Sequence, residues 1–260
     1  MTKIKKWWDD IPTLTTKVRK LYTKLEDKGN SDIITATYKK IISERKWGPV
    51  ESIIHNNLLD VIKEHGIYYI PKGFEPGPMF VFPQYDVDGI PMKAQTKPLY
   101  DIGNGSKYWI AGDRDNFLGP SWLGNSDKMI ERILNEKYVV VIEGTFDFVA
   151  VRALCPEIPA LCSLTKKLGY KQEAYLRMLG VETLYLMFDQ DEQGIQAAEL
   201  TKKIYKSMQV ELVKTPAKDA SKALENRNHA NILKDILYSI VEANTKTINE
   251  ESRIIILEEE

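Results

Sequence analysis

The sequence has few cysteines and no long apolar run, and both absences narrow the class of protein. Its 260 residues include two cysteines, Cys155 and Cys162, and neither belongs to a C-x-x-C pair or lies near a histidine cluster. A structural zinc site and a disulfide framework are therefore not expected. No apolar run approaches membrane-spanning length, and the N-terminus lacks the apolar core of a signal peptide. These features predict a cytoplasmic chain with reduced cysteines and no membrane association.

An excess of either charge is also missing. The 36 basic and 37 acidic residues give a formal net charge of −1. This balance excludes a strongly basic coat for nucleic acid, although a local basic groove remains possible. The length is sufficient for a large core in one domain or two modest ones, and the sequence contains no internal repeat.

The first half of the chain changes its hydrophobic period near residue 65. Residues 1–64 are predicted to form an N-terminal helical segment, with helices at 14–25, 33–42 and 50–62. Residues 65–136 are predicted to form a small mixed α+β subdomain, with strands at 67–70, 79–82 and 89–94 and a helix at 127–136. Between the last of these strands and the helix, residues 98–124 show no clear period and are predicted to be a long loop or surface segment.

The second half alternates strands and helices, which is typical of an α/β fold with a mainly parallel sheet and flanking helices. Within a predicted domain at 137–215, strands are expected at 138–142, 160–163, 183–188 and 210–213, and helices at 145–154, 171–179 and 192–208. Residues 216–260 are predicted to form a C-terminal helical segment with an acidic tail, with helices at 221–225 and 229–243. Residues 253–257 are predicted to form an edge strand or a partner-docking segment.

A glutamate ends the most apolar of these strands. Residues 138–142 read Tyr-Val-Val-Val-Ile, Glu143 follows as the first charged residue, and Gly144 permits a sharp turn into the next helix. In open α/β sheets, ligands bind at the carboxyl ends of the strands, where Glu143 would lie. On its own such a glutamate is equally compatible with a solvated strand end or a cap.

Two aspartates repeat this arrangement at the end of a later strand. Asp189 and Asp191 follow an apolar run and precede Gly194 and a helix. Parallel strands bring their carboxyl ends to one edge, so Glu143 and this pair can converge. Two carboxylates about 5 Å apart at an effective dielectric near 20 repel by roughly 3 kcal/mol, and a divalent cation would remove that cost. Oxygen ligands suit Mg²⁺ or Mn²⁺. Alone, Asp-x-Asp is more often a polar turn.

These motifs resemble the toprim domain, and within that group they are most similar to bacterial-type (DnaG-like) primases. The pattern Val-Glu-Gly-x-x-Asp is similar to residues 142–147, and Asp-x-Asp-x-x-Gly-x-x-Ala-Ala resembles residues 189–198. A later acidic motif after a strand resembles residues 218–221, which include Asp219. Upstream, residues 81–92 and the sequence Ser106-Lys107-Tyr108 resemble the small subdomain that precedes toprim in primases.

The resemblance implies a DNA primase catalytic core that makes short RNA primers on single-stranded DNA from ribonucleoside triphosphates. It implies that Glu143 acts as a general base, with Asp189 and Asp191 as further catalytic residues. Two or more Mg²⁺ or Mn²⁺ ions would be held by five carboxylates: Glu143, Asp147, Asp189, Asp191 and Asp219. Lys107 and Lys97 would hold template or nucleotide phosphates, and the metals would support in-line nucleotidyl transfer.

The sequence also departs from the family pattern. Ser221 stands where primases usually have a second aspartate, and residues 119–124 lack the expected basic side chains, for which Lys166 and Lys167 on another loop could compensate. Neither a zinc-binding domain nor a Walker-type helicase motif is found, so a replicative helicase or other replisome protein is the expected partner, as for a phage-like core. The alternatives are a toprim nuclease that uses the same carboxylates and a non-catalytic replication accessory protein.

Overall fold

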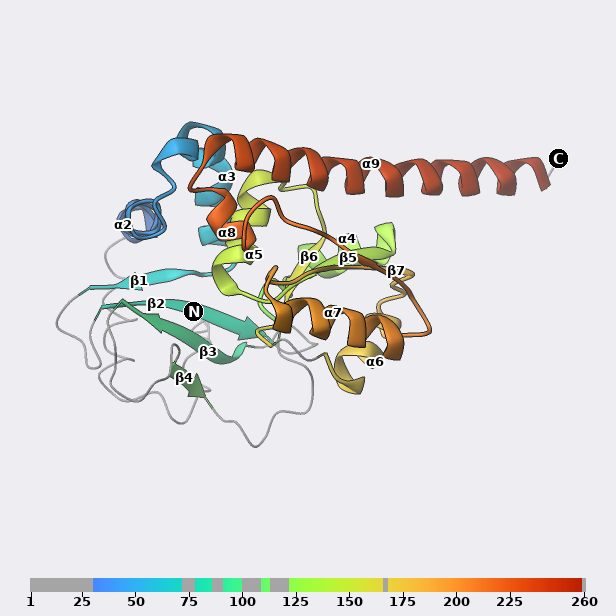
Figure 1. Ribbon diagram of the computed structural model, residues 1–260, viewed down its shortest axis with the longest axis horizontal. Helices are drawn as coiled ribbons and strands as arrows, with labels where there is room; N and C mark the ends of the chain where they lie inside the picture. Colours follow the sequence, from blue (N-terminus) through green and yellow to red (C-terminus); the bar gives the residue numbers. More distant parts are fainter. Residues whose placement is uncertain are drawn as a thin grey trace, which may run out of the picture.

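The computed structural model describes residues 30–71, 78–85, 91–99, 109–112, 122–165 and 168–258. Within these residues the chain forms one antiparallel sheet and one parallel sheet, with helices packed around the parallel sheet (Figure 1). The helix predicted at 14–25 lies outside the described residues. No described helix combines the length and the apolar character needed to cross a bilayer.

From residue 30 onward, two helices precede the sheets, and they correspond to the helices predicted at 33–42 and 50–62. They are α2 (Asn30–Glu44) and α3 (Glu51–Glu64), joined through the short helix η2 (Gly48–Val50). The buried residues of α3 are Ile54, Leu58, Val61 and Ile62, a spacing that places them on one helical face. At the turn after α2, Lys46 takes a left-handed φ of 57°, and Trp47 is completely buried.

The antiparallel sheet has the order β1-β2-β3-β4. Its strands are β1 (Tyr68–Ile70), β2 (Met79–Tyr85), β3 (Pro91–Pro98) and β4 (Trp109–Gly112). The prediction of a loop over 98–124 was wrong in part, because β4 pairs with β3 there and Leu123 forms a bridge with Cys162. Four residues are too few to display a period of two, so the sequence pattern could not reveal β4.

The parallel sheet has the order β6-β5-β7-β8, with β5 at its centre. Its strands are β5 (Tyr138–Ile142), β6 (Ala160–Cys162), β7 (Thr183–Met187) and β8 (Gln209–Leu212). The helices around them are α4 (Asp127–Glu136), α5 (Thr145–Leu154), α6 (Tyr170–Met178) and α7 (Glu192–Ile204). The predicted α/β class and parallel sheet are confirmed. The helix predicted to reach residue 208 ends at Ile204, because Tyr205 turns inward and its hydroxyl donates to the Gly169 carbonyl at 2.9 Å.

Alternate residues of β5 serve two separate cores. Val140 and Ile142 pack with α3, α5 and the C-terminal helices, whereas Val139 and Val141 pack with α4, α6 and α7. All five residues of β5 are buried. This strand therefore has apolar cover on both faces, as its uninterrupted apolar sequence predicts.

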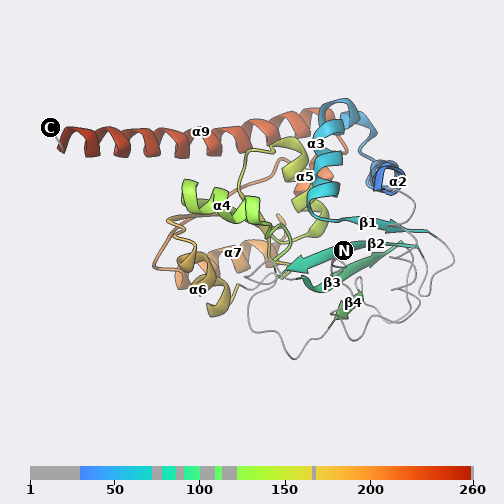
Figure 2. The same ribbon diagram turned by 180° about the vertical axis from the view of Figure 1, so that it is seen from behind.

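The C-terminal segment consists of α8 (Ala220–Ala223) and α9 (Arg227–Glu258). Leu233 and Leu237 of α9 enter the same core as α3 and α5, and beyond them the helix extends past the rest of the molecule (Figures 1 and 2). The prediction that residues 253–257 form an edge strand was wrong, since they continue α9. A docking role for them, like the proposed domain boundaries at 64, 136 and 215, stays a prediction.

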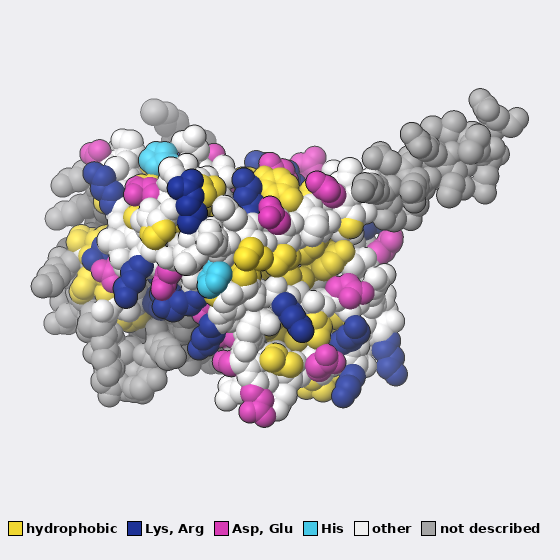
Figure 3. All heavy atoms as spheres, turned by 45° about the horizontal axis from the view of Figure 1, so that its top comes forward, with side chains coloured by type: hydrophobic (Ala, Val, Ile, Leu, Met, Phe, Trp, Pro, Cys, Tyr) yellow, Lys and Arg dark blue, Asp and Glu magenta, His cyan; other side chains and the backbone are white. Residues whose placement is uncertain are grey.

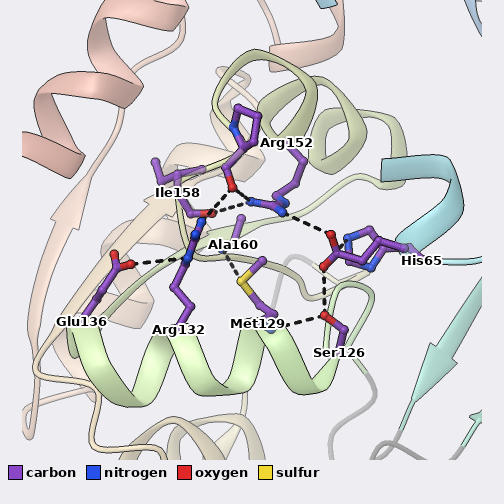
Figure 4. A network of polar contacts seen from close by, with 10 residues as sticks. His65, Ser126, Met129, Arg132, Glu136, Arg152, Ile158 and Ala160 are labelled. Carbon is purple, nitrogen blue, oxygen red and sulfur yellow. Dashed lines mark hydrogen bonds and ion pairs between the residues drawn. The ribbon is translucent and has the colours of Figure 1, made fainter. Parts of the chain in front are cut away.

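A buried polar network joins α3 to the parallel sheet (Figure 4). Glu64 at the end of α3 accepts a hydrogen bond from Ser126, the N-cap of α4, at 3.0 Å and lies 3.6 Å from the guanidinium of Arg152 in α5. Arg152 also donates to the Ile158 carbonyl at 3.0 Å. The neighbouring His65 is buried, with its ring 5.0 Å from that of Phe148. These polar contacts thus join the end of α3 to α4 and α5, which pack around the parallel sheet.

Candidate active site

The acidic residues leave the parallel sheet at one edge. In the register of β5 and β7, Ile142 lies opposite Met187. Glu143 follows Ile142 directly, and Asp189 follows Met187 after one residue. Because the strands are parallel, both carboxylates emerge at the carboxyl edge of the sheet, as the sequence predicts.

Two glycines are required by the local geometry of these strand ends. A Cβ on Gly144 would lie 2.1 Å from Asp147 Oδ2, so the carboxylate in the first turn of α5 occupies the space that a side chain would need. A Cβ on Gly194 would lie 2.2 Å from the carbonyl oxygen of Asp189. The Glu-Gly-x-x-Asp and Asp-x-Asp-x-x-Gly spacings therefore have a steric cause in this chain.

Two other aspartates cap helices at this edge. Asp191 is the N-cap of α7, and its Oδ1 accepts a hydrogen bond from the Gly194 amide at 2.9 Å. Asp219 is the N-cap of α8 and accepts from the Lys222 amide at 2.6 Å. The backbone amide of Gln190 donates to the Lys218 carbonyl at 2.8 Å. This bond ties the loop that carries Asp189 and Asp191 to the loop that carries Asp219.

Asp147 lies partly buried at this edge, and neighbouring carboxylates affect its pKa. This pKa is raised to about 7. Burial is the largest cause, the charges of Asp219 and Asp189 add to the rise, and the Ser221 amide and Arg45 oppose it. Burial likewise raises the pKa of the Cys162 thiol, with smaller contributions from Asp147 and Glu143. The hydrogen bonds from Gln190 to Lys218 and from the Ser221 amide to Asp147 place Asp147, Asp189 and Asp219 at the same sheet edge, in a region where negative charge is disfavoured.

The donor set at this edge fits a hard divalent cation by its chemistry. Every candidate ligand offers carboxylate oxygens, which suit Mg²⁺ or Mn²⁺. A cation would offset both the burial and the charges of Asp219 and Asp189 that raise the pKa of Asp147. Within the described ranges, no three His, Cys, Asp or Glu side chains are gathered closely enough to hold one ion as they lie.

Arg45 and Trp47 reach this edge from the turn between α2 and η2, and the sequence pattern gave no sign of it. Arg45 donates to Ser221 Oγ through Nη2 at 2.8 Å and through Nε at 3.1 Å. Its guanidinium also lies 4.8 Å from the centroid of the Phe146 ring. The turn carries no spacing that links it to residues 100 or more positions later, so only the fold reveals the contact.

Of the four lysines predicted to bind nucleic acid or nucleotide, the structure describes one, Lys97. Lys97 on β3 lies near the acidic edge, with Nζ 5.2 Å from the Phe146 ring centroid. Lys107, Lys166 and Lys167 lie outside the described residues. On the face shown in Figure 3, the coloured Lys and Arg side chains are interspersed with Asp and Glu and form no continuous basic track.

Residues 140–224, from β5 to α8, match a family model described as Toprim-like. This part of the chain is a toprim-like domain, and the carboxylates described above, Glu143 to Asp219, all lie within it. No curated protein matches the sequence.

The fold of the larger chain is that of DnaG-type primase catalytic cores. The primase fragment of the bacteriophage T7 primase-helicase protein aligns with a TM-score of 0.52 at 19% identity, covering 70% of each chain. The RNA polymerase domain of Mycobacterium tuberculosis primase DnaG, in complex with a DNA oligomer with a 6-nucleotide overhang, gives 0.56 at 18%, covering 79% of this chain and 73% of that one. A DnaG primase catalytic domain bound to single-stranded DNA gives 0.56 at 16%, covering 88% and 79%.

Proposed function

We propose that this protein is a DNA primase catalytic core that synthesises short RNA primers on single-stranded DNA. The observation that carries the proposal is the placement of Asp147, Asp189 and Asp219 at one sheet edge, where hydrogen bonds tie their loops together, within a fold similar to primase cores. The antiparallel sheet is part of the support, since a primase-like subdomain beside the toprim-like domain favours synthesis over a nuclease that uses the same carboxylates.

Mg²⁺ or Mn²⁺ bound at this edge would neutralise the charge of a nucleoside triphosphate and help to activate a primer 3′-hydroxyl. Asp147, Asp189, Asp191 and Asp219 would hold the ions, and Glu143 would accept the proton of the hydroxyl. Arg45 and Lys97, which flank the Phe146 ring, would face the phosphates as fixed positive charges. A single-stranded template and ribonucleoside triphosphates are the substrates, and a replicative helicase in the cytoplasm is the expected partner.

Primer synthesis tests the proposal directly. The full chain is incubated with a single-stranded template, labelled ribonucleotides and Mg²⁺ or Mn²⁺, and we expect short template-dependent RNA products. Asp189→Asn should reduce the rate by at least about a hundredfold, because a neutral amide cannot replace a carboxylate that stabilises the transition state through an ion. Shortened nucleic acid without primer products would instead identify a nuclease.

A further inference from the structure

One buried serine joins the turn between α2 and η2 to the acidic edge. Ser221 is 2% exposed and lies in α8, two residues after Asp219. Its amide donates to Asp147 Oδ1 at 2.8 Å, its Oγ accepts the two hydrogen bonds from Arg45, and its carbonyl accepts from Trp47 Nε1 at 2.9 Å. All three polar groups of Ser221 are therefore engaged, each with a different residue.

These contacts fix the guanidinium of Arg45 in two directions. Ser221 Oγ holds its edge, while the Phe146 ring lies against it at 4.8 Å. Phe146 is itself immobilised, since it is 3% exposed and its ring packs edge-on against Phe80 and Phe82. Trp47, two residues after Arg45, anchors the backbone of the same turn to the Ser221 carbonyl. Arg45 is thus a long, flexible side chain whose rotamers are restricted by its surroundings.

We propose that Ser221 is a positioning residue, which holds the Arg45 guanidinium beside Asp147 and so sets the positive charge at this corner of the acidic edge. Arg45 is 176 positions away in the sequence. Without the hydroxyl, the guanidinium would lose both of its hydrogen bonds to Ser221, although the amide bond to Asp147 would remain. The inference rests on the proposed function, since a positioned cation matters there for an anionic substrate and for divalent ions.

A double-mutant cycle separates this role from a contribution to stability. The variants are Ser221→Ala, Arg45→Ala and the double variant, made in the full chain. The control is Thr201→Ala, which also removes a buried hydroxyl, one that donates to the Ala197 carbonyl within α7. For each protein the Mn²⁺ titration midpoint is measured by electron paramagnetic resonance without nucleotide, together with kcat/KM for primer synthesis and Tm.

We expect Ser221→Ala to lower kcat/KM by about tenfold or more, because both lost hydrogen bonds to the guanidinium are charge-assisted, and to shift the Mn²⁺ midpoint. Both effects should vanish in the Arg45→Ala background, because the hydroxyl acts through the guanidinium. The change in Tm should not exceed that of Thr201→Ala.

Equal effects in the two backgrounds would overturn the proposal, and so would a Ser221→Ala variant with unchanged kinetics and an unchanged Mn²⁺ midpoint. The Mn²⁺ measurement needs no synthesis. Coupling between Arg45 and Ser221 in a protein that makes no primers would therefore contradict the proposed function while supporting the positioning role.

Discussion

Gly144 has no side chain, and this leaves room for the carboxylate of Asp147, a proposed metal ligand. A methyl group there would overlap the end of the Asp147 side chain, which can rotate away, so we expect Gly144→Ala to displace the carboxylate and leave the fold intact. Mn²⁺ affinity should fall by about tenfold or more, the loss of one well-placed charged contact. Isothermal titration with Mn²⁺ and a thermal melt measure the two effects separately.

Two other glycines calibrate this experiment. A Cβ on Gly48 would meet no atom within 4 Å, so Gly48→Ala should leave both quantities unchanged. At Gly194 the obstacle is the Asp189 backbone, which cannot rotate away, and overpacking there should destabilise the fold by about 1–3 kcal/mol. If Gly144→Ala bound Mn²⁺ as the wild type does, Asp147 would not be a ligand.

The sequence predicted the acidic residues of the candidate site and Lys97, but it did not predict Arg45. Glu143 and Asp189 stand out because each interrupts an apolar run, and this change of residue type is a local signal. The position of Arg45 depends on how α2, α3 and α8 pack together, which is a long-range property. Ser221 drew notice in the sequence only as a departure from the family motif, and its hydrogen bonds became evident in the fold.

At the scale of elements, the contact between α3 and α5 contains a pH-sensitive group. His65 is 1% exposed, and within the described residues neither ring nitrogen forms a hydrogen bond. Burial lowers its pKa, with Arg152 acting in the same direction and Glu64 opposing. The unfolded chain therefore takes up this proton at a higher pH than the folded chain, and stability present above pH 6.5 is lost as the pH falls below it, by at most about 1.4 kcal/mol per pH unit.

Urea denaturation at pH 7.5 and pH 5.5, compared between the wild type and His65→Phe, checks this expectation. The phenyl ring keeps the contact with Phe148 but cannot be protonated, so the variant should lose less stability on acidification. Asp147 acts in the opposite sense, because its raised pKa makes its contribution decline as the pH rises toward 7, but it is common to both proteins. The same pH dependence in both would show that His65 is not the responsible group.

Element boundaries show how far local pattern extends. The limits predicted for α4 and β5 agree with the structure, since each is framed by strong signals: Ser126 caps α4, and apolar residues fill β5. The end of α7 was predicted too late because its termination depends on Tyr205 packing near Gly169. The prediction also ended α9 at 243, where the apolar spacing fades, whereas the helix runs on to Glu258.

At the scale of the whole molecule, α9 divides into a packed part and a projecting part. Leu233 and Leu237 are fully buried, whereas the C-terminal part of the helix extends beyond the body in both ribbon views. Deleting residues 246–260 should therefore change the free energy of unfolding by less than about 1 kcal/mol, because only buried contacts carry large stabilisation. Leu237→Ala should cost about 2–5 kcal/mol.

Chemical denaturation of the two variants beside the wild type measures both quantities. A large loss of stability on truncation would mean that the projecting part is covered in solution, and sedimentation analysis would then show whether a second copy covers it.

The hydrogen bonds between Arg45 and Ser221 also bear on the order in which the chain folds during its synthesis. The two residues lie 176 positions apart, so during synthesis all strands of both sheets are made before Ser221. Contacts of such long range form late, because the intervening chain must first be ordered. A nascent chain thus carries Arg45, Asp147 and Asp189 before Asp219 and Ser221 are made, and we expect the guanidinium to be held in place only after α8 has formed.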